Sequence, residues 1–109
     1  MRNKDENKAK NILINNSWFR DYYYIKEVIE SCIENVLITN GVYNPIKTIM
    51  NARRWGFNLL RNKIDGLCDR YPTLDTEIRS IYYTYMDDLR NIFESSFNKI
   101  SNKLDESNG

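Results

Sequence analysis

Few residues in this sequence are of the types that carry out chemistry. The chain has no histidine, and its two cysteines, Cys32 and Cys68, lie far apart. Without histidine, neither a Ser–His nor a Cys–His nucleophile pair can form, and the commonest general base is missing. The cysteines form no CxxC pair, so we expect buried free thiols rather than a zinc site or a disulfide. The sequence therefore predicts a protein that is not an enzyme and that uses no metal and no cofactor.

The acidic pair Asp87–Asp88 is the next candidate for chemistry. It ends the tetrapeptide YMDD, which resembles the metal-binding motif of reverse transcriptases. That motif lies on a β-hairpin of a far larger domain, whereas here it falls inside an expected helix of a short chain. We interpret the resemblance as coincidental and the two acids as solvated surface. The sequence also has no Gly-rich phosphate loop and no EF-hand loop.

The remaining candidate is the cationic stretch NARRWGFNLLRNK, residues 51–63. Residues 45–64 carry five cations and no acid, whereas 17–40 and 73–94 each carry more acids than cations. Arg and Asn along one helix can follow phosphates or read bases, and exposed Trp and Arg are enriched at protein interfaces. A third interpretation is that a basic helix simply complements two acidic neighbours within the fold. We favour a protein interface over nucleic acid, because the cationic cluster is small and the net charge is only +1.

A helical projection divides this stretch into faces. Trp55 points away from the core, with Leu59, Thr48 and Ala52 on the same side. The outward faces give the candidate partner-binding residues, which are Lys47, Asn51, Arg54, Trp55, Asn58, Leu59 and Arg61. The core seam is expected to contain Ile46, Met50, Arg53, Phe57, Leu60, Ile64, Leu67 and Tyr71. Arg53 is an anomaly in that seam, so it must either meet a carboxylate or extend past the edge of the core.

Apolar residues recur at helical spacing through most of the chain and predict three helices, at about 17–40, 45–71 and 74–104. In the first helix the seam is Trp18, Tyr22, Ile25, Ile29, Cys32 and Val36. Short connections make sequential helices antiparallel neighbours. The predicted fold is therefore all-α, an elongated up-down-up three-helix bundle over residues 15–104. Residues 1–14 are expected to form a flexible N-terminal arm, and 105–109 a flexible tail.

The helix boundaries follow from capping residues. Ser17 is a plausible N-cap, and Asn40–Gly41 would end the first helix. Asn44–Pro45 would begin the second, and Pro72 would end it. Asp65–Gly66 offers an earlier end for the second helix.

Two further surfaces stand out in the sequence. The apolar face of the third helix widens towards its end and gives a candidate oligomer face: Met86, Phe93, Phe97, Ile100 and Leu104. Eight tyrosines are too many for a three-helix core, and Tyr23 and Tyr83 are expected to project outward.

The sequence thus predicts a small helical protein that binds a macromolecule. No apolar run is long enough to cross a membrane, and no leader pattern is present, so we expect a cytoplasmic protein that does not engage membranes. Abundant Asn and Ile with rare Ala are typical of AT-rich coding, which favours a phage or mobile-element protein that modulates or inhibits a host protein. The alternatives are a small nucleic-acid-binding regulator that uses the basic face of the second helix, and a structural homodimer subunit.

Overall fold

The computed structural model describes the backbone of residues 2–39 and 45–108, and the side chains of 4–32 and 46–102. The elements are α1 (Arg2–Asn15), α2 (Trp18–Thr39), α3 (Pro45–Arg70), the short 3₁₀ turn η1 (Pro72–Leu74) and α4 (Asp75–Asn108). None of the described residues is in a strand, so the predicted all-α class is confirmed.

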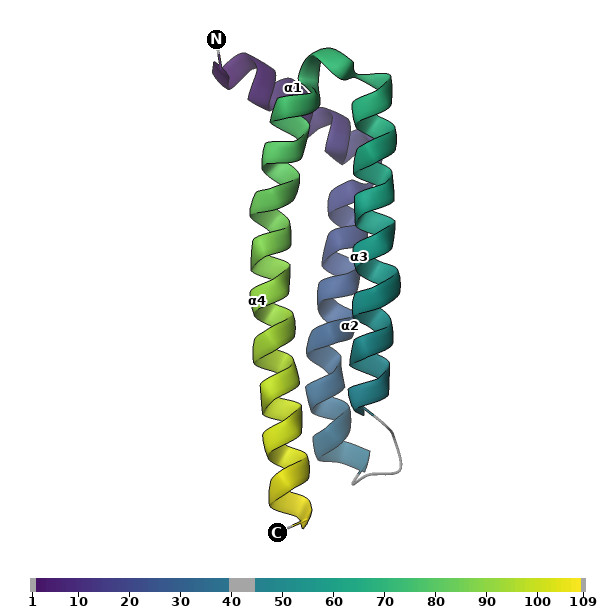
Figure 1. Ribbon diagram of the computed structural model, residues 1–109, viewed down its shortest axis with the longest axis vertical. Coiled ribbons are helices and arrows are strands. Elements are labelled where there is room, and N and C mark those ends of the chain that lie inside the picture. Colours follow the sequence, from purple (N-terminus) through teal and green to yellow (C-terminus); the bar gives the residue numbers. More distant parts are fainter. Residues whose placement is uncertain (1, 40–44, 109) are drawn as a thin grey trace.

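The three long helices α2, α3 and α4 lie side by side, and consecutive ones run in opposite directions (Figure 1). Each of them packs against the other two. The short helix α1 lies across one end and packs against α2 and α4. The molecule measures 57 × 20 × 16 Å and is therefore elongated.

Helix α1 is the main departure from the predicted architecture. We predicted a flexible arm over residues 1–14, but residues 2–15 form a helix in which Ala9 and Leu13 are fully buried. These two residues are one helical turn apart, so a single face of α1 contacts the rest of the fold. A helix with so few apolar residues is marginal in isolation, and its stability therefore depends on this contact.

Ser17 is the junction between α1 and α2. Its amide donates to the carbonyl of Ile14 (3.1 Å), and its carbonyl accepts from the amide of Asp21 (3.1 Å). Ser17 thus stands immediately before the first residue of α2, as predicted. It also has φ 63°, in the left-handed region that glycine or asparagine adopts more easily.

The core seam predicted for α2 is confirmed where its side chains are described. Trp18, Tyr22, Ile25, Ile29 and Cys32 are all buried, and Val36 lies outside the described side chains. The Trp18 indole Nε1 donates to the carbonyl of Leu60 on α3 at 3.1 Å. The aromatic rings around Trp18 come from both α2 and α4: Phe19, Tyr22, Tyr82 and Tyr85.

The core face of α3 is rotated from the predicted seam. Met50 and Arg53 are exposed and Phe57 is only half-buried, whereas Ala52 and Gly56 are buried. A Cβ on Gly56 would lie 2.8 Å from Cγ2 of Ile25, so α3 and α2 approach closely at this point. The prediction gave priority to large apolar residues, but close contact between these helices requires small ones.

The remaining boundaries differ from the predictions by a few residues. Helix α3 ends at Arg70 and passes through Gly66, so the alternative end at Asp65–Gly66 is wrong. Helix α4 continues to Asn108, where a tail after residue 104 was predicted. The predicted stop at Asn40–Gly41 and the cap at Asn44 lie outside the described residues.

Cys32 and Cys68 are both buried, and neither forms a disulfide within the described part of the chain. Burial is the main cause that raises the pKa of the Cys68 thiol to about 11. A hydrogen bond with Asp75 acts in the same direction. Cys68 is therefore a poor nucleophile near neutral pH.

Candidate functional site

All seven predicted partner-binding residues are exposed along α3, and they are Lys47, Asn51, Arg54, Trp55, Asn58, Leu59 and Arg61. The structure therefore brings them together on the outward side of one helix. Ala52, which was also placed on this side, is instead buried in the core. Its neighbour Thr48 is half-buried.

Trp55 and two neighbours form an exposed apolar group across α2 and α3, here called the aromatic patch. Trp55 is 42% exposed, and its ring centroid lies 6.3 Å from that of Tyr24 on α2, which is 60% exposed. Leu59, one turn further along α3, completes the patch and is also exposed. Covering a tryptophan removes a large apolar area from water, which favours binding. An exposed Trp beside a second exposed ring is therefore typical of a binding surface.

The cations of α3 differ in whether the fold itself neutralises them. Lys63 forms an ion pair with Asp21 of α2. Arg53, Arg54 and Arg61 form no ion pair with any carboxylate of the described residues. Packing of a basic helix against acidic neighbours thus accounts for Lys63 but not for the three arginines.

Arg53 was an anomaly because it fell in the predicted core seam of α3. In the structure it lies outside the core. Its side chain is exposed, and its guanidinium carbon lies 5.4 Å from the ring centroid of Phe57 and 5.2 Å from that of Phe93 on α4. Both rings are half-buried at the edge of the core. The charge is therefore held by two cation–π contacts rather than by a buried carboxylate.

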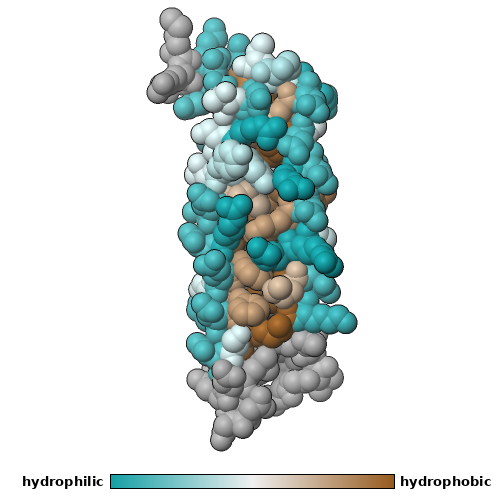
Figure 2. Space-filling model, viewed as in Figure 1, coloured by the Kyte–Doolittle hydropathy of each residue, from teal (hydrophilic) through white to brown (hydrophobic). Residues whose placement is uncertain are grey.

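A hollow of about 600 Å³ opens beside Arg53. It is lined from one helix by Met50, Asn51, Arg53, Arg54, Phe57 and Asn58. Figure 2 shows apolar side chains gathered in a band on the face between α3 and α4, with hydrophilic atoms on either side. Met50 is 45% exposed, although it was predicted to lie in the core.

The predicted oligomer face is wrong for two of its five residues. Met86 and Ile100 are buried within the chain and belong to the core. Phe93 and Phe97 are half-buried, with ring centroids 5.9 Å apart. Leu104 lies outside the described side chains. Packing by the protein's own helices thus buries Met86 and Ile100, on a surface that we had expected a second copy or the partner to cover.

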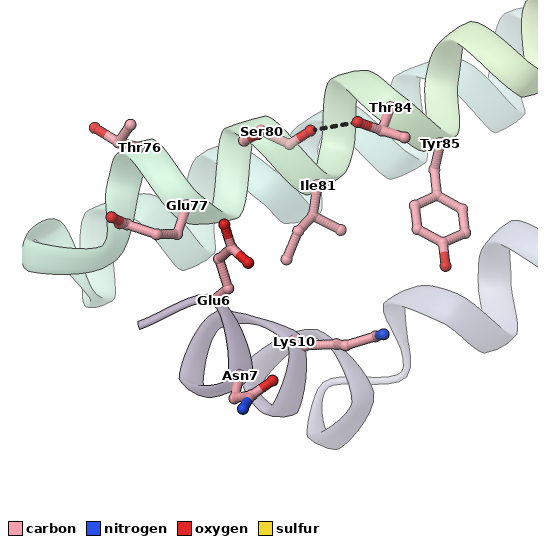
Figure 3. Close-up of a pocket in the computed structure, with 9 residues that line it drawn as sticks. All are labelled: Glu6, Asn7, Lys10, Thr76, Glu77, Ser80, Ile81, Thr84 and Tyr85. Atoms are coloured by element: carbon pink, nitrogen blue, oxygen red, sulfur yellow. Dashed lines mark hydrogen bonds between the residues drawn. The ribbon is translucent and has the colours of Figure 1, made fainter. Parts of the chain in front are cut away.

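A second hollow, which the sequence did not predict, lies between α1 and α4 (Figure 3). It has a volume of about 460 Å³ and is lined by Glu6, Asn7, Lys10, Thr76, Glu77, Ser80, Ile81, Thr84 and Tyr85. The Thr84 hydroxyl donates to the Ser80 carbonyl at 3.1 Å. The sequence did not predict this hollow, because a flexible arm was expected where α1 forms.

The tyrosines divide between core and surface. Tyr23 and Tyr83 are exposed, as predicted. Tyr22 is buried, and burial is the first cause that raises its pKa to about 12. It therefore stays protonated and packs as a neutral ring within the aromatic cluster.

The described side chains contain no group of three or more His, Cys, Asp or Glu residues that could hold a metal ion. Across the described part of the chain, no helix combines the length and apolar character that crossing a membrane requires. No protein-family model matches the chain, and neither a curated protein nor a solved structure matches it. The surface chemistry of the described residues is therefore the only guide to function.

Proposed function

We propose that this chain is a small non-enzymatic binding protein that engages a protein partner through the outward face of α3. The observation that carries the proposal is the exposure of Trp55 in the middle of α3, beside exposed Tyr24 and next to Arg54. Trp, Tyr and Arg are the residue types that contribute most binding energy at protein interfaces. In this proposal α2, α3 and α4 act as an up-down-up three-helix scaffold that presents α3.

The biological setting is proposed from composition. The abundance of Asn and Ile and the scarcity of Ala are typical of AT-rich coding, which is consistent with a phage or mobile-element protein that modulates or inhibits a host protein in the cytoplasm. The aromatic patch would then cover part of that host protein's surface.

A second candidate function is binding of nucleic acid, which is favoured by three arginines on α3 without carboxylate partners among the described residues. Phosphates would satisfy these cations but would leave Trp55 and Leu59 uncovered. A homodimer is a third candidate, supported by half-buried Phe93 and Phe97 on α4 and by exposed Met50 on α3. We favour a protein partner because it alone covers the aromatic patch and the charges together.

The test immobilises four forms of the protein and compares which proteins each form retains from a lysate of the source cells. The four forms are wild type, Trp55→Ala, Arg54→Glu and Tyr83→Ala. Tyr83 is a matched control because it is a 55% exposed aromatic residue on α4. Trp55→Ala should cost less than about 1 kcal/mol of stability, because the side chain is exposed. Arg54→Glu should fold like wild type, since Arg54 is exposed and forms no ion pair with the described residues.

A protein retained by wild type and by Tyr83→Ala should be lost by both α3 variants, with affinity reduced roughly thirtyfold or more. Equal retention by Trp55→Ala would reject the proposal. Salt separates the two macromolecular candidates. Phosphate binding through the three arginines would lose about one and a half decades of affinity between roughly 50 and 200 mM salt, whereas a Trp-centred protein interface would lose much less.

A further inference from the structure

The guanidinium of Arg53 is held in a position suited to bind a carboxylate. Its carbon lies 5.4 Å and 5.2 Å from the ring centroids of Phe57 and Phe93. These rings restrict the side chain, while the N–H groups of Arg53 have no carboxylate among the described residues. A guanidinium that is restricted before binding loses less freedom when it forms a two-pronged contact with a carboxylate.

The surroundings of Arg53 combine charge with apolar surface. The same hollow contains a second arginine, Arg54, and two amide side chains, Asn51 and Asn58. Its apolar walls are exposed Met50 and half-buried Phe57. Residues 45–64 carry no acid, so no acid within this part of α3 balances the positive charge of the hollow.

From these contacts we infer that the hollow on α3 binds an acidic, amphipathic segment of the protein partner. A carboxylate of that segment pairs with Arg53, a second one lies near Arg54, and an apolar side chain covers Met50 and Phe57. The inference rests on the proposed function and specifies the chemistry of the partner. Phe57 and Phe93 act as positioning residues, because they hold the guanidinium without touching the bound segment's carboxylate.

Two other occupants fit the hollow less well. Nucleic-acid phosphates would pair with the arginines but would leave the exposed thioether of Met50 without an apolar contact. A second copy of the chain carries exposed acids on α4, such as Asp88 and Glu94, but most of the described apolar residues of that helix already pack in or against its own core. Both occupants are distinguished in the experiment below.

The experiment is a fluorescence-anisotropy titration with a labelled synthetic helix in which Glu and Leu recur at one-turn spacing. The comparison probes are the same peptide with Gln in place of Glu, and a DNA duplex. The protein variants are Arg53→Gln, Arg53→Lys and Arg70→Gln. Arg70 is the matched control, because it is an exposed arginine of α3 stacked at 5.6 Å on a single ring, that of Tyr71, outside the hollow.

The inference predicts saturable binding of the acidic peptide that weakens at least about tenfold in Arg53→Gln. Arg53→Lys should weaken it by about threefold or more, since lysine keeps the charge but loses the planar fork. Arg70→Gln should bind within about twofold of wild type, as exposed surface substitutions usually do. Far-UV circular dichroism confirms that each variant is folded.

Phe93→Leu tests the positioning role separately. In wild type the Arg53 Nε–H proton should show an NMR shift caused by the two rings. That shift should shrink in Phe93→Leu, and affinity for the acidic peptide should fall about threefold with helicity unchanged. An unchanged Nε–H resonance and unchanged affinity would contradict the positioning role.

Several outcomes overturn the inference. They are no saturable binding of the acidic peptide, equal binding of the Gln peptide, tighter binding of the DNA, or equal binding by Arg53→Gln. Self-association of the protein alone that disappears in Arg53→Gln would assign the hollow to a second copy instead. If the natural partner is lost by Trp55→Ala but retained by Arg53→Gln, the proposed function stands and this inference fails. Retention of that partner by both variants rejects the proposed function itself.

Discussion

Replacing Gly56 by alanine should destabilise the protein, although alanine is the better helix former. In an open helix interior, Gly→Ala gains about 1 kcal/mol. At Gly56, however, the new Cβ would lie 2.8 Å from Cγ2 of Ile25 and 3.2 Å from its Cγ1 and Cδ1. Cγ2 branches from the Cβ of a fully buried residue in α2, so it is a stiff neighbour. Overpacking of this kind costs about 1–3 kcal/mol, and the expected net effect is a loss of about 1 kcal/mol.

Gly66 provides the matched control on the same helix. It is exposed, and a Cβ there would meet nothing within 4 Å. Gly66→Ala should therefore stabilise the protein by about 0.5–1 kcal/mol. Thermal unfolding followed by circular dichroism should place the two variants on opposite sides of wild type.

A double-mutant cycle identifies the cause. Ile25→Ala removes the opposing methyl groups at a cost of about 2–5 kcal/mol, and in that background Gly56→Ala should become stabilising by about 1 kcal/mol. If Gly56→Ala stabilises the wild-type protein as much as Gly66→Ala does, then α2 and α3 are not in close contact here and the described rotation of α3 is wrong.

Three further perturbations test the fold. Ser17→Gly should stabilise the protein by up to about 1 kcal/mol, because the φ of 63° at position 17 strains a residue that has a Cβ. Ser17→Val should destabilise the protein for the same reason. A lower melting temperature in the glycine variant would contradict this. Trp18→Phe should lower the free energy of unfolding by about 2 kcal/mol or more, because it removes buried surface and leaves the Leu60 carbonyl without its indole donor. Urea unfolding measures this loss, and a loss below about 0.5 kcal/mol would argue against that hydrogen bond. The raised pKa of Cys68, from 9.0 to about 11, favours the protonated thiol in the folded state, so its contribution to stability is fully present below pH 9 and is lost as pH rises towards 11. Cys68→Ala should flatten the urea-unfolding stability profile across that window, and an equally steep profile would show that the thiol is not responsible.

The seam of α2 could be predicted because its buried residues are also its large apolar ones. Trp18, Tyr22, Ile25 and Ile29 stand at alternating spacings of four and three, and all are buried. Where size and burial coincide in this way, periodicity is sufficient to orient a helix. The all-α class followed from the same pattern in all three long helices.

The orientation of α3 could not be predicted in the same way. Helix α3 approaches α2 closely at Gly56, and Ala52, one turn earlier on α3, is also buried. A projection weighted by apolar size turned Met50 and Phe57 inward instead. The spacing of two small residues by one turn was the available signal, and it conflicted with the larger residues beside it.

Helix α1 was missed because its apolar content is low. Only Ala9 and Leu13 are fully buried among its described side chains, and the residues between them are mostly exposed. Its order arises from contact with α2 and α4, which are distant in sequence or join it only through a tight turn. The exposure of Trp55, by contrast, was predictable, because its position faces away from the predicted seam and remains outside the buried positions of α3 after the observed rotation.

The central claim is that the outward face of α3 contacts another protein, and site-specific photo-crosslinking measures that contact directly. A photoreactive phenylalanine analogue would replace Trp55 in one variant and Tyr83 of α4 in another, and both would be irradiated in the source cells. We predict a discrete protein adduct from position 55, its loss when Arg54→Glu is added, and no such adduct from position 83. Equal adducts from the two positions, or an adduct at 55 that nuclease removes, would contradict the claim.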